Sequence, residues 1–125
     1  MNYQSAAASY SQVKTHSGVE DASPHKLIDM LYDGLLERIA QAKGAVQHKN
    51  VELKGKKING AINIINGLRE NLNHDNGIEL ASNLDGLYVY VQNILLEGHR
   101  DNSIQKLDEA YTLIEDIASA WKQIG

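Results

Sequence analysis

Apolar side chains recur every three or four residues in four successive stretches of the chain, the spacing that places them on one side of an α-helix. The first three stretches cover residues 24–48, 51–72 and 78–97, and the fourth follows the pair Asn102-Ser103. Long amphipathic helices with short connections pack as antiparallel neighbours. The pattern therefore predicts an all-α fold, an antiparallel up-down four-helix bundle.

The apolar side of each stretch predicts the core of that bundle. We expect residues 22–125 to form a single domain and residues 1–21 to form an N-terminal tail or a short capping helix. The expected core residues are Ile28, Leu31, Leu35, Ile39, Ala42, Val46, Ile58, Ala61, Ile62, Ile65, Leu68, Leu72, Ala81, Leu84, Tyr88, Val91, Leu95, Ile104, Leu107, Tyr111, Ile114, Ala118 and Trp121.

Short polar residues mark the expected helix ends. Ser23 before Pro24 predicts the start of the first helix, because serine caps free amide groups and proline fits the first helical position. Asn50 predicts the next cap, and either Asn102 or Ser103 caps the last helix. The segment 73–77 predicts a turn, and the segment 98–101, which begins with glycine, is expected to end the third helix.

Gly60 and Gly67 lie on the same face of the second expected helix. Each costs about 1 kcal/mol relative to alanine inside a helix. The pair indicates either a close approach by a neighbouring element or a soft helix that tolerates surface glycines.

Two of the expected helices carry more apolar side chains than one buried face requires. In the third helix the excess lies on both flanks of the core line, and in the first helix Leu27 and Met30 lie on one flank and Tyr32 and Leu36 on the other. This excess predicts a deeply buried helix, contact with a second copy of the chain, or a groove for another protein's amphipathic helix. The flanking residues of the third helix are Leu87, Tyr90 and Ile94 on one side and Val89 and Leu96 on the other.

Composition excludes several function classes. Twelve basic against sixteen acidic residues give a net charge of −4, and the basic residues are scattered, which argues against a nucleic-acid partner. The absence of cysteine excludes disulfides and thiolate metal sites and fits a reducing cytosol. The N-terminal residues lack a basic segment followed by an apolar run, so we expect no secretion signal. No apolar run is long enough to insert into a membrane.

Acidic and histidine residues show no catalytic spacing. The chain has no Glu-x-x-His pair of the kind that holds metals in helical bundles. Asp29, Asp33 and Glu37 lie four residues apart and predict an exposed acidic edge with Lys26 and Arg38 nearby. We therefore expect no metal, no cofactor and no enzymatic activity.

His48 is a candidate for phosphotransfer, because histidine phosphotransfer domains are also helical bundles and carry Leu-Lys-Gly just after the phosphorylated histidine. Leu53-Lys54-Gly55 is present, but Val51 stands where that histidine is expected. His48 lies at a predicted helix end, so the match fails where the chemistry is needed. The chain is expected to bind a partner rather than to catalyse a reaction.

Several segments of the chain carry distinctive combinations of residues. They are Tyr10 with Val13, Ser23-Pro24, Lys26-Leu27-Ile28 and Met30-Leu31-Tyr32-Asp33-Gly34, and later Ile62 to Leu68, Asn83-Leu84, Leu87-Tyr88, Tyr90 and Ala120-Trp121. Together these segments resemble the signature of the flagellin-specific export chaperones of bacterial flagellar secretion, the FliS family. The resemblance departs at Asn76-Gly77, where the family usually has two glycines, and at Asp21-Ala22, where it has threonine and alanine.

This resemblance implies a cytosolic, non-enzymatic chaperone of the flagellar type III export system. Such a chaperone binds the disordered C-terminal segment of flagellin, prevents premature polymerisation, and helps deliver the subunit to a component of the export gate. The N-terminal tail would form a lid over part of the groove. The expected partner-binding residues are Tyr10, Val13, Ile28, Leu31, Tyr32, Leu87, Tyr90 and Ile94.

The alternative is a bundle that buries its surplus apolar surface by self-association, as a homodimer without a client. In either case Leu31 and Leu35 should face the core. Tyr32 or Met30, on opposite flanks of the first helix, should border the surface where a partner or the tail lies.

Overall fold

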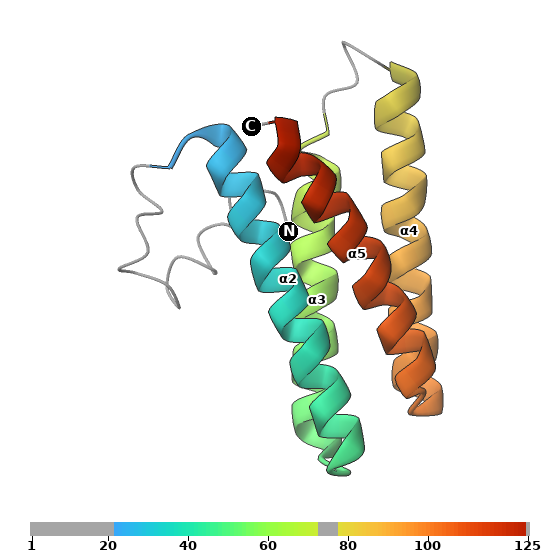
Figure 1. The fold of residues 1–125 in the computed structure, drawn as a ribbon. Helices are drawn as coiled ribbons and strands as arrows, with labels where there is room; N and C mark the ends of the chain where they lie inside the picture. Colours follow the sequence, from blue (N-terminus) through green and yellow to red (C-terminus); the bar gives the residue numbers. More distant parts are fainter. Residues whose placement is uncertain (1–21, 73–77, 125) are drawn as a thin grey trace.

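A computed structural model describes residues 22–72 and 78–124 of the chain. Consecutive helices run antiparallel, as Figure 1 shows, and the described residues contain no strand. Helices α2 and α4 each pack against both α3 and α5, so the four helices surround one core. This confirms the predicted four-helix bundle, whose elements are α2 (Pro24–Gln47), α3 (Val51–Glu70), α4 (Ile78–Asp101) and α5 (Ile104–Ile124).

The predicted caps begin α2 and α3. The Ser23 hydroxyl accepts a hydrogen bond of 3.1 Å from the Lys26 amide, and Pro24 occupies the first turn. The side-chain oxygen of Asn50 accepts a 3.1 Å bond from the Leu53 amide. Each cap satisfies one of the backbone donors that a helix start leaves free.

The end of α4 differs from the prediction, because Gly98 does not break the helix. The residue is buried inside α4, and a Cβ atom at this position would lie 2.9 Å from Cδ2 of Leu107. The glycine therefore lets α4 and α5 approach closely. The helix continues to Asp101, Asn102 takes a left-handed conformation with φ 50°, and Ser103 caps α5.

Apolar side chains from all four helices meet in one core, and Leu31 and Leu35 face it as predicted. The core also contains Ile64 and Ile94, which lie outside the expected core line of their helices. The predicted positions that it includes are Ile28, Leu31, Leu35, Ile39, Ala42, Ile58, Ala61, Ile65, Leu68, Tyr88, Val91, Leu95, Leu107, Ile114 and Ala118, with Val46, Ile62, Leu72, Leu84, Tyr111 and Trp121 packed against it.

The close approach suggested for Gly60 comes from a side chain of α2. A Cβ atom on Gly60 would lie 3.0 Å from Cδ and Nε of Arg38. The Arg38 guanidinium reaches back to donate a hydrogen bond to the carbonyl oxygen of Gly34. Glycine at this position therefore lets the arginine side chain lie flat between the two helices.

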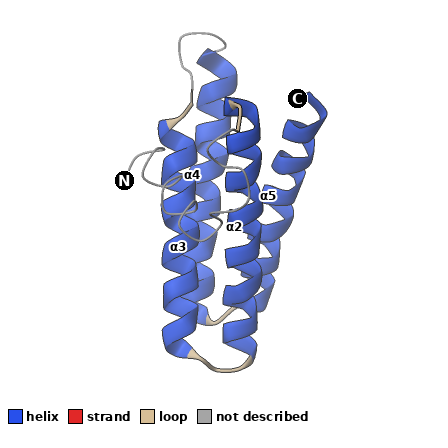
Figure 2. Ribbon diagram, turned by 90° about the vertical axis from the view of Figure 1, so that its left-hand side faces the viewer, coloured by secondary structure: helices blue, strands red, loops and turns tan. Residues whose placement is uncertain are grey.

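The two ends of the bundle are built differently. At the turn end, which we define by residues 48–50 and 102–103, the α2–α3 and α4–α5 connections are short (Figure 2). The open end is the opposite one, where α2 and α4 begin and α3 and α5 end. Part-way along the α3–α4 seam, Arg69 pairs with Asp85 at 2.7 Å, and this pair ties the two helices together.

Candidate functional site

Helix α4 carries large apolar side chains on its outer surface. The exposed fractions are 39% for Leu87, 46% for Tyr90 and 50% for Leu96. Leu87 and Tyr90 lie three residues apart on one flank, whereas Leu96 lies on the other. Exposed apolar groups of this size make α4 the candidate for a binding surface.

The flank with Leu87 and Tyr90 faces α5. The Tyr90 hydroxyl donates a 2.6 Å hydrogen bond to the Glu109 carboxylate, and this bond raises the pKa of the Tyr90 phenol. The bond spans the α4–α5 seam, and Tyr90 stays largely exposed. We call Leu87, Tyr90 and Glu109 the seam surface. It combines an apolar contact area with one charged acceptor.

Four of the predicted partner-binding side chains lie inside the bundle. Ile28, Leu31, Tyr32 and Ile94 are only 1–6% exposed and belong to the core. Leu87 and Tyr90 lie on the surface, while Tyr10 and Val13 are outside the described residues. The structure therefore brings two of the predicted residues together on the seam surface and places four in the core.

Tyr32 and Met30, one of which was expected to border a surface covered by a partner or the tail, are both buried. The reason at Tyr32 is a partner on α4, because its hydroxyl lies 2.5 Å from that of Tyr88 in a buried hydrogen bond. Burial raises the pKa of both phenols, although the bond from Tyr88 partly offsets the rise at Tyr32. The tyrosine pair joins α2 to α4 across the core.

This pair predicts a loss of stability in alkali. A pKa raised above its ordinary value of 10.0 means that the folded state holds the proton after the unfolded state has released it. The contribution is fully present below pH 10.0 and falls as pH rises towards the folded-state values. We expect the urea midpoint to fall between pH 10 and 11 in the native chain, and less in a Tyr32→Phe/Tyr88→Phe double variant. Equal falls in the two proteins would contradict this expectation.

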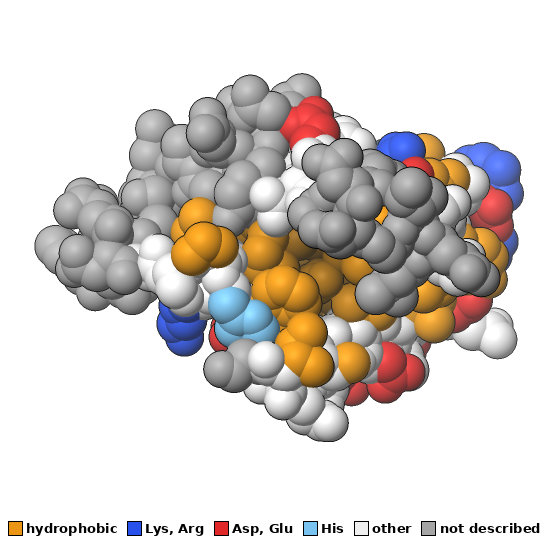
Figure 3. Space-filling model, turned by 90° about the horizontal axis from the view of Figure 1, so that it is seen from above, with side chains coloured by type: hydrophobic (Ala, Val, Ile, Leu, Met, Phe, Trp, Pro, Cys, Tyr) orange, Lys and Arg blue, Asp and Glu red, His pale blue; other side chains and the backbone are white. Residues whose placement is uncertain are grey.

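Aromatic residues join the first and last helices at the open end. The His25 ring stacks on Trp121 with 4.4 Å between centroids, and the indole N–H donates a 3.0 Å bond to the His25 carbonyl. Figure 3 views the molecule from this end and shows hydrophobic side chains gathered near its centre. Apolar side chains are therefore also visible at the open end of the bundle.

Charged residues on α2 form surface pairs. The Lys122 ammonium of α5 lies 2.5 Å from Asp29 and 3.5 Å from Asp33, and Lys26 lies 3.8 Å from Asp29. The expected proximity of Lys26 to this acidic edge is confirmed. Lys122 was not anticipated, because nothing in the local sequence shows that the end of α5 returns to the start of α2.

The structure places His48, the residue considered for phosphotransfer, at a helix end as predicted. His48 is the exposed C-cap of α2. Over residues 22–72 and 78–124, no three histidine, aspartate or glutamate side chains gather in a way that suits a metal ion. In the same residues, no helix has the length and apolar content needed to cross a bilayer.

Known proteins resemble this chain over most of its length. A family model described as flagellar protein FliS matches residues 6–125. The chain is similar to the flagellar secretion chaperone FliSB of Pseudomonas aeruginosa, at 44% identity over 120 residues that cover 96% of this chain and 95% of the relative.

More distant relatives match over similar lengths. The flagellar secretion chaperone FliS of Salmonella typhimurium is 41% identical over 122 residues, which cover 97% of this chain and 90% of the relative. The protein of the same name from Bacillus subtilis is 33% identical over 107 residues, with 86% and 79% covered. These matches extend across all four helices.

Proposed function

We propose, since the chain belongs to the FliS family of flagellar secretion chaperones, that it binds the C-terminal segment of flagellin before export. The chaperone role follows from the family. The client and its binding surface are our proposal, and the observation that carries it is the exposed apolar seam surface of α4 and α5.

A disordered client segment loses conformational entropy when it orders, so its chaperone must provide a long apolar contact. An amphipathic helix of the client can lie along the seam surface, with its apolar side against Leu87 and the Tyr90 ring. Glu109 then offers a carboxylate to a basic or amide group of the client. Holding the segment in this way would prevent flagellin from polymerising prematurely.

The proposal includes a second step, in which the client reaches predicted site residues that are buried in the core. Ile28 and Leu31 can be reached only if the bundle opens or a covering segment moves, since both pack in the core. The N-terminal tail with Tyr10 and Val13 is proposed as the lid that controls access. The loaded chaperone would then meet a component of the export gate in the cytosol and release its client there.

The most informative experiment compares two forms of flagellin. Isothermal titration of the full chain with intact flagellin should show one saturable binding event, and flagellin that lacks its C-terminal segment should give none. Equal binding to both forms, or binding to neither, would overturn the proposed function.

The seam surface predicts a flank-specific loss of client binding. Leu87→Asp places a charge in the apolar contact and should weaken binding of the flagellin segment by about tenfold or more. Leu96→Asp is the matched control, because Leu96 is similarly exposed on the opposite flank of the same helix. The control should change affinity by less than about twofold. Equal effects of the two variants would contradict the placement on the α5 side.

Self-association remains the alternative use of the same surface. A homodimer would bury Leu87 and Tyr90 against a second copy, and it requires no client. Sedimentation measurements of the free chain decide between the two, since a tight dimer that dissociates on Tyr90→Ala would favour the alternative. A monomer that forms a one-to-one complex with flagellin would favour the chaperone proposal.

A further inference from the structure

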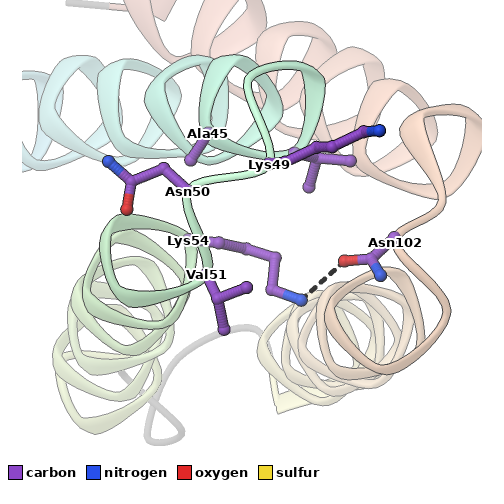
Figure 4. Close-up of a pocket in the computed structure, with 7 residues that line it drawn as sticks. Ala45, Lys49, Asn50, Val51, Lys54 and Asn102 are labelled. Atoms are coloured by element: carbon purple, nitrogen blue, oxygen red, sulfur yellow. Dashed lines mark hydrogen bonds between the residues drawn. The ribbon is translucent and has the colours of Figure 1, made fainter.

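A pocket of about 370 Å³ opens at the turn end, away from the seam surface. It lies between the α2–α3 and α4–α5 connections, as Figure 4 shows. The lining has an apolar part and a part rich in hydrogen-bond donors, and none of the lining residues is acidic. The lining residues are Ala45, Val46, Lys49, Asn50, Val51, Lys54 and Asn102.

Lys54 is the unusual member of this lining, because it is a charged residue that is only 7% exposed. Its ammonium group donates to the carbonyl oxygen of His99 at 3.0 Å and to the side-chain oxygen of Asn102 at 2.6 Å. Both acceptors are neutral, and the third N–H of the ammonium group has no partner among the described residues. Buried charges are normally balanced by an opposite charge.

Nearby groups do not supply that balance. The neighbouring carboxylate of Asp101 pairs with Arg100 at 2.8 Å. His99 also buries its Nδ1 atom without a hydrogen-bond partner in the described part of the chain. Polar groups at the turn end are therefore not all satisfied by the bundle itself, which is uncommon in a folded protein.

The other polar lining residues add donors of the same kind. Lys49 brings a second positive charge to the rim. The side-chain oxygen of Asn102 already accepts a bond from Lys54, so the NH2 group of this amide remains to donate. A carboxylate is acceptor-only and carries the opposite charge, so it matches these groups.

We propose that this pocket is a binding site for an aliphatic carboxylate. The carboxylate accepts from the Lys54 ammonium and is attracted by Lys49, while its short aliphatic stem lies against Ala45, Val46 and Val51. Such a group occurs as the C-terminus of a peptide, as an acidic side chain, or as a free small acid. The site is separate from the seam surface, so it does not depend on the proposed flagellin binding.

Nuclear magnetic resonance of the full chain tests the site, with butyrate as the probe and neutral butyramide as its isostere, at constant ionic strength. We expect butyrate to cause saturable shifts of the Lys49, Val51 and Asn102 amides. Butyramide and added chloride should cause none. Shifts that do not saturate, or that chloride reproduces, would overturn the proposal.

Three lysine substitutions test which positive charges butyrate binding requires. Lys49→Asn removes a charge and suits the left-handed backbone there, where φ is 58°, so the fold is kept. It should weaken butyrate binding about three- to fivefold. Lys54→Gln should weaken it about tenfold or more, and Lys56→Gln, an exposed lysine outside the pocket, should leave it unchanged. If Lys54→Gln fails to fold, unchanged binding in Lys49→Asn is the result that overturns the site.

Two further probes identify the source of the carboxylate. N-Acetylvaline imitates a peptide C-terminus, and the α-amide of N-acetylglutamate imitates an acidic side chain. Tighter binding of either one than of butyrate supports the site and identifies that source, and binding of butyrate alone supports a free small acid. Failure of all three probes overturns the proposal while leaving the chaperone function untouched.

Discussion

Replacing Gly98 by valine is expected to destabilise the bundle by about 2–3 kcal/mol, since overpacking a tight contact forces neighbours off their preferred positions. A Cβ atom at residue 98 would lie 2.9 Å from Cδ2 and 3.3 Å from Cγ of Leu107. Leu107 is fully buried, so its side chain has little room to move away. The free energy of unfolding from urea titration measures the effect.

Gly86→Val in the same helix is the control. Gly86 is exposed, and nothing lies within 4 Å of a Cβ atom built there. Valine is a slightly better helix former than glycine, so the unfolding free energy should stay within about 0.5 kcal/mol of the native chain. A similar loss in both variants would mean that helix propensity, rather than the contact with Leu107, decides the outcome.

The hydroxyl bond between Tyr32 and Tyr88 should show a strong non-additive effect. Either single change to phenylalanine leaves a buried hydroxyl without its partner and should cost about 1–3 kcal/mol of unfolding free energy. The double variant removes both hydroxyls and should cost no more than one single change. A double-mutant cycle by urea titration measures the coupling.

Tyr111→Phe provides the reference for this cycle, because Tyr111 is partly buried beside the same core. Its hydroxyl has no hydrogen bond to another described residue, so the change should shift stability by less than about 0.5 kcal/mol. Strict additivity of the Tyr32 and Tyr88 changes would show that the two hydroxyls do not interact in solution.

Local sequence was sufficient to predict the helices and most of the core. Each serine or asparagine cap bonds to a backbone amide three residues further along the chain. The apolar period of each helix depends only on its own sequence. Ser23, Asn50 and the stripe from Ile28 to Ala42 were therefore placed correctly. The physical cause of each of these features lies in its own segment of the sequence.

Partners that are distant in the sequence decided the rest. Tyr32 was placed on a flank, because periodicity gives an angle around the helix axis but not the position of Tyr88, 56 residues away. Gly98 was interpreted as a helix end, whereas its role is to admit Leu107. The burial of Lys54 could not be seen from sequence either, since its acceptors lie on α4 and in the α4–α5 connection.

The return of α5 to the start of α2 affects how the chain folds as it is made. Helices α2 and α3 are adjacent in sequence and can pair early, but α2 also packs against α5, which lies much later in the chain. The stacking of His25 on Trp121 joins residues 96 positions apart. Because α5 follows the other described helices in the sequence, α2 can complete its packing only after α5 has been synthesised. Until then, nascent α2 exposes the apolar surface that the mature core buries.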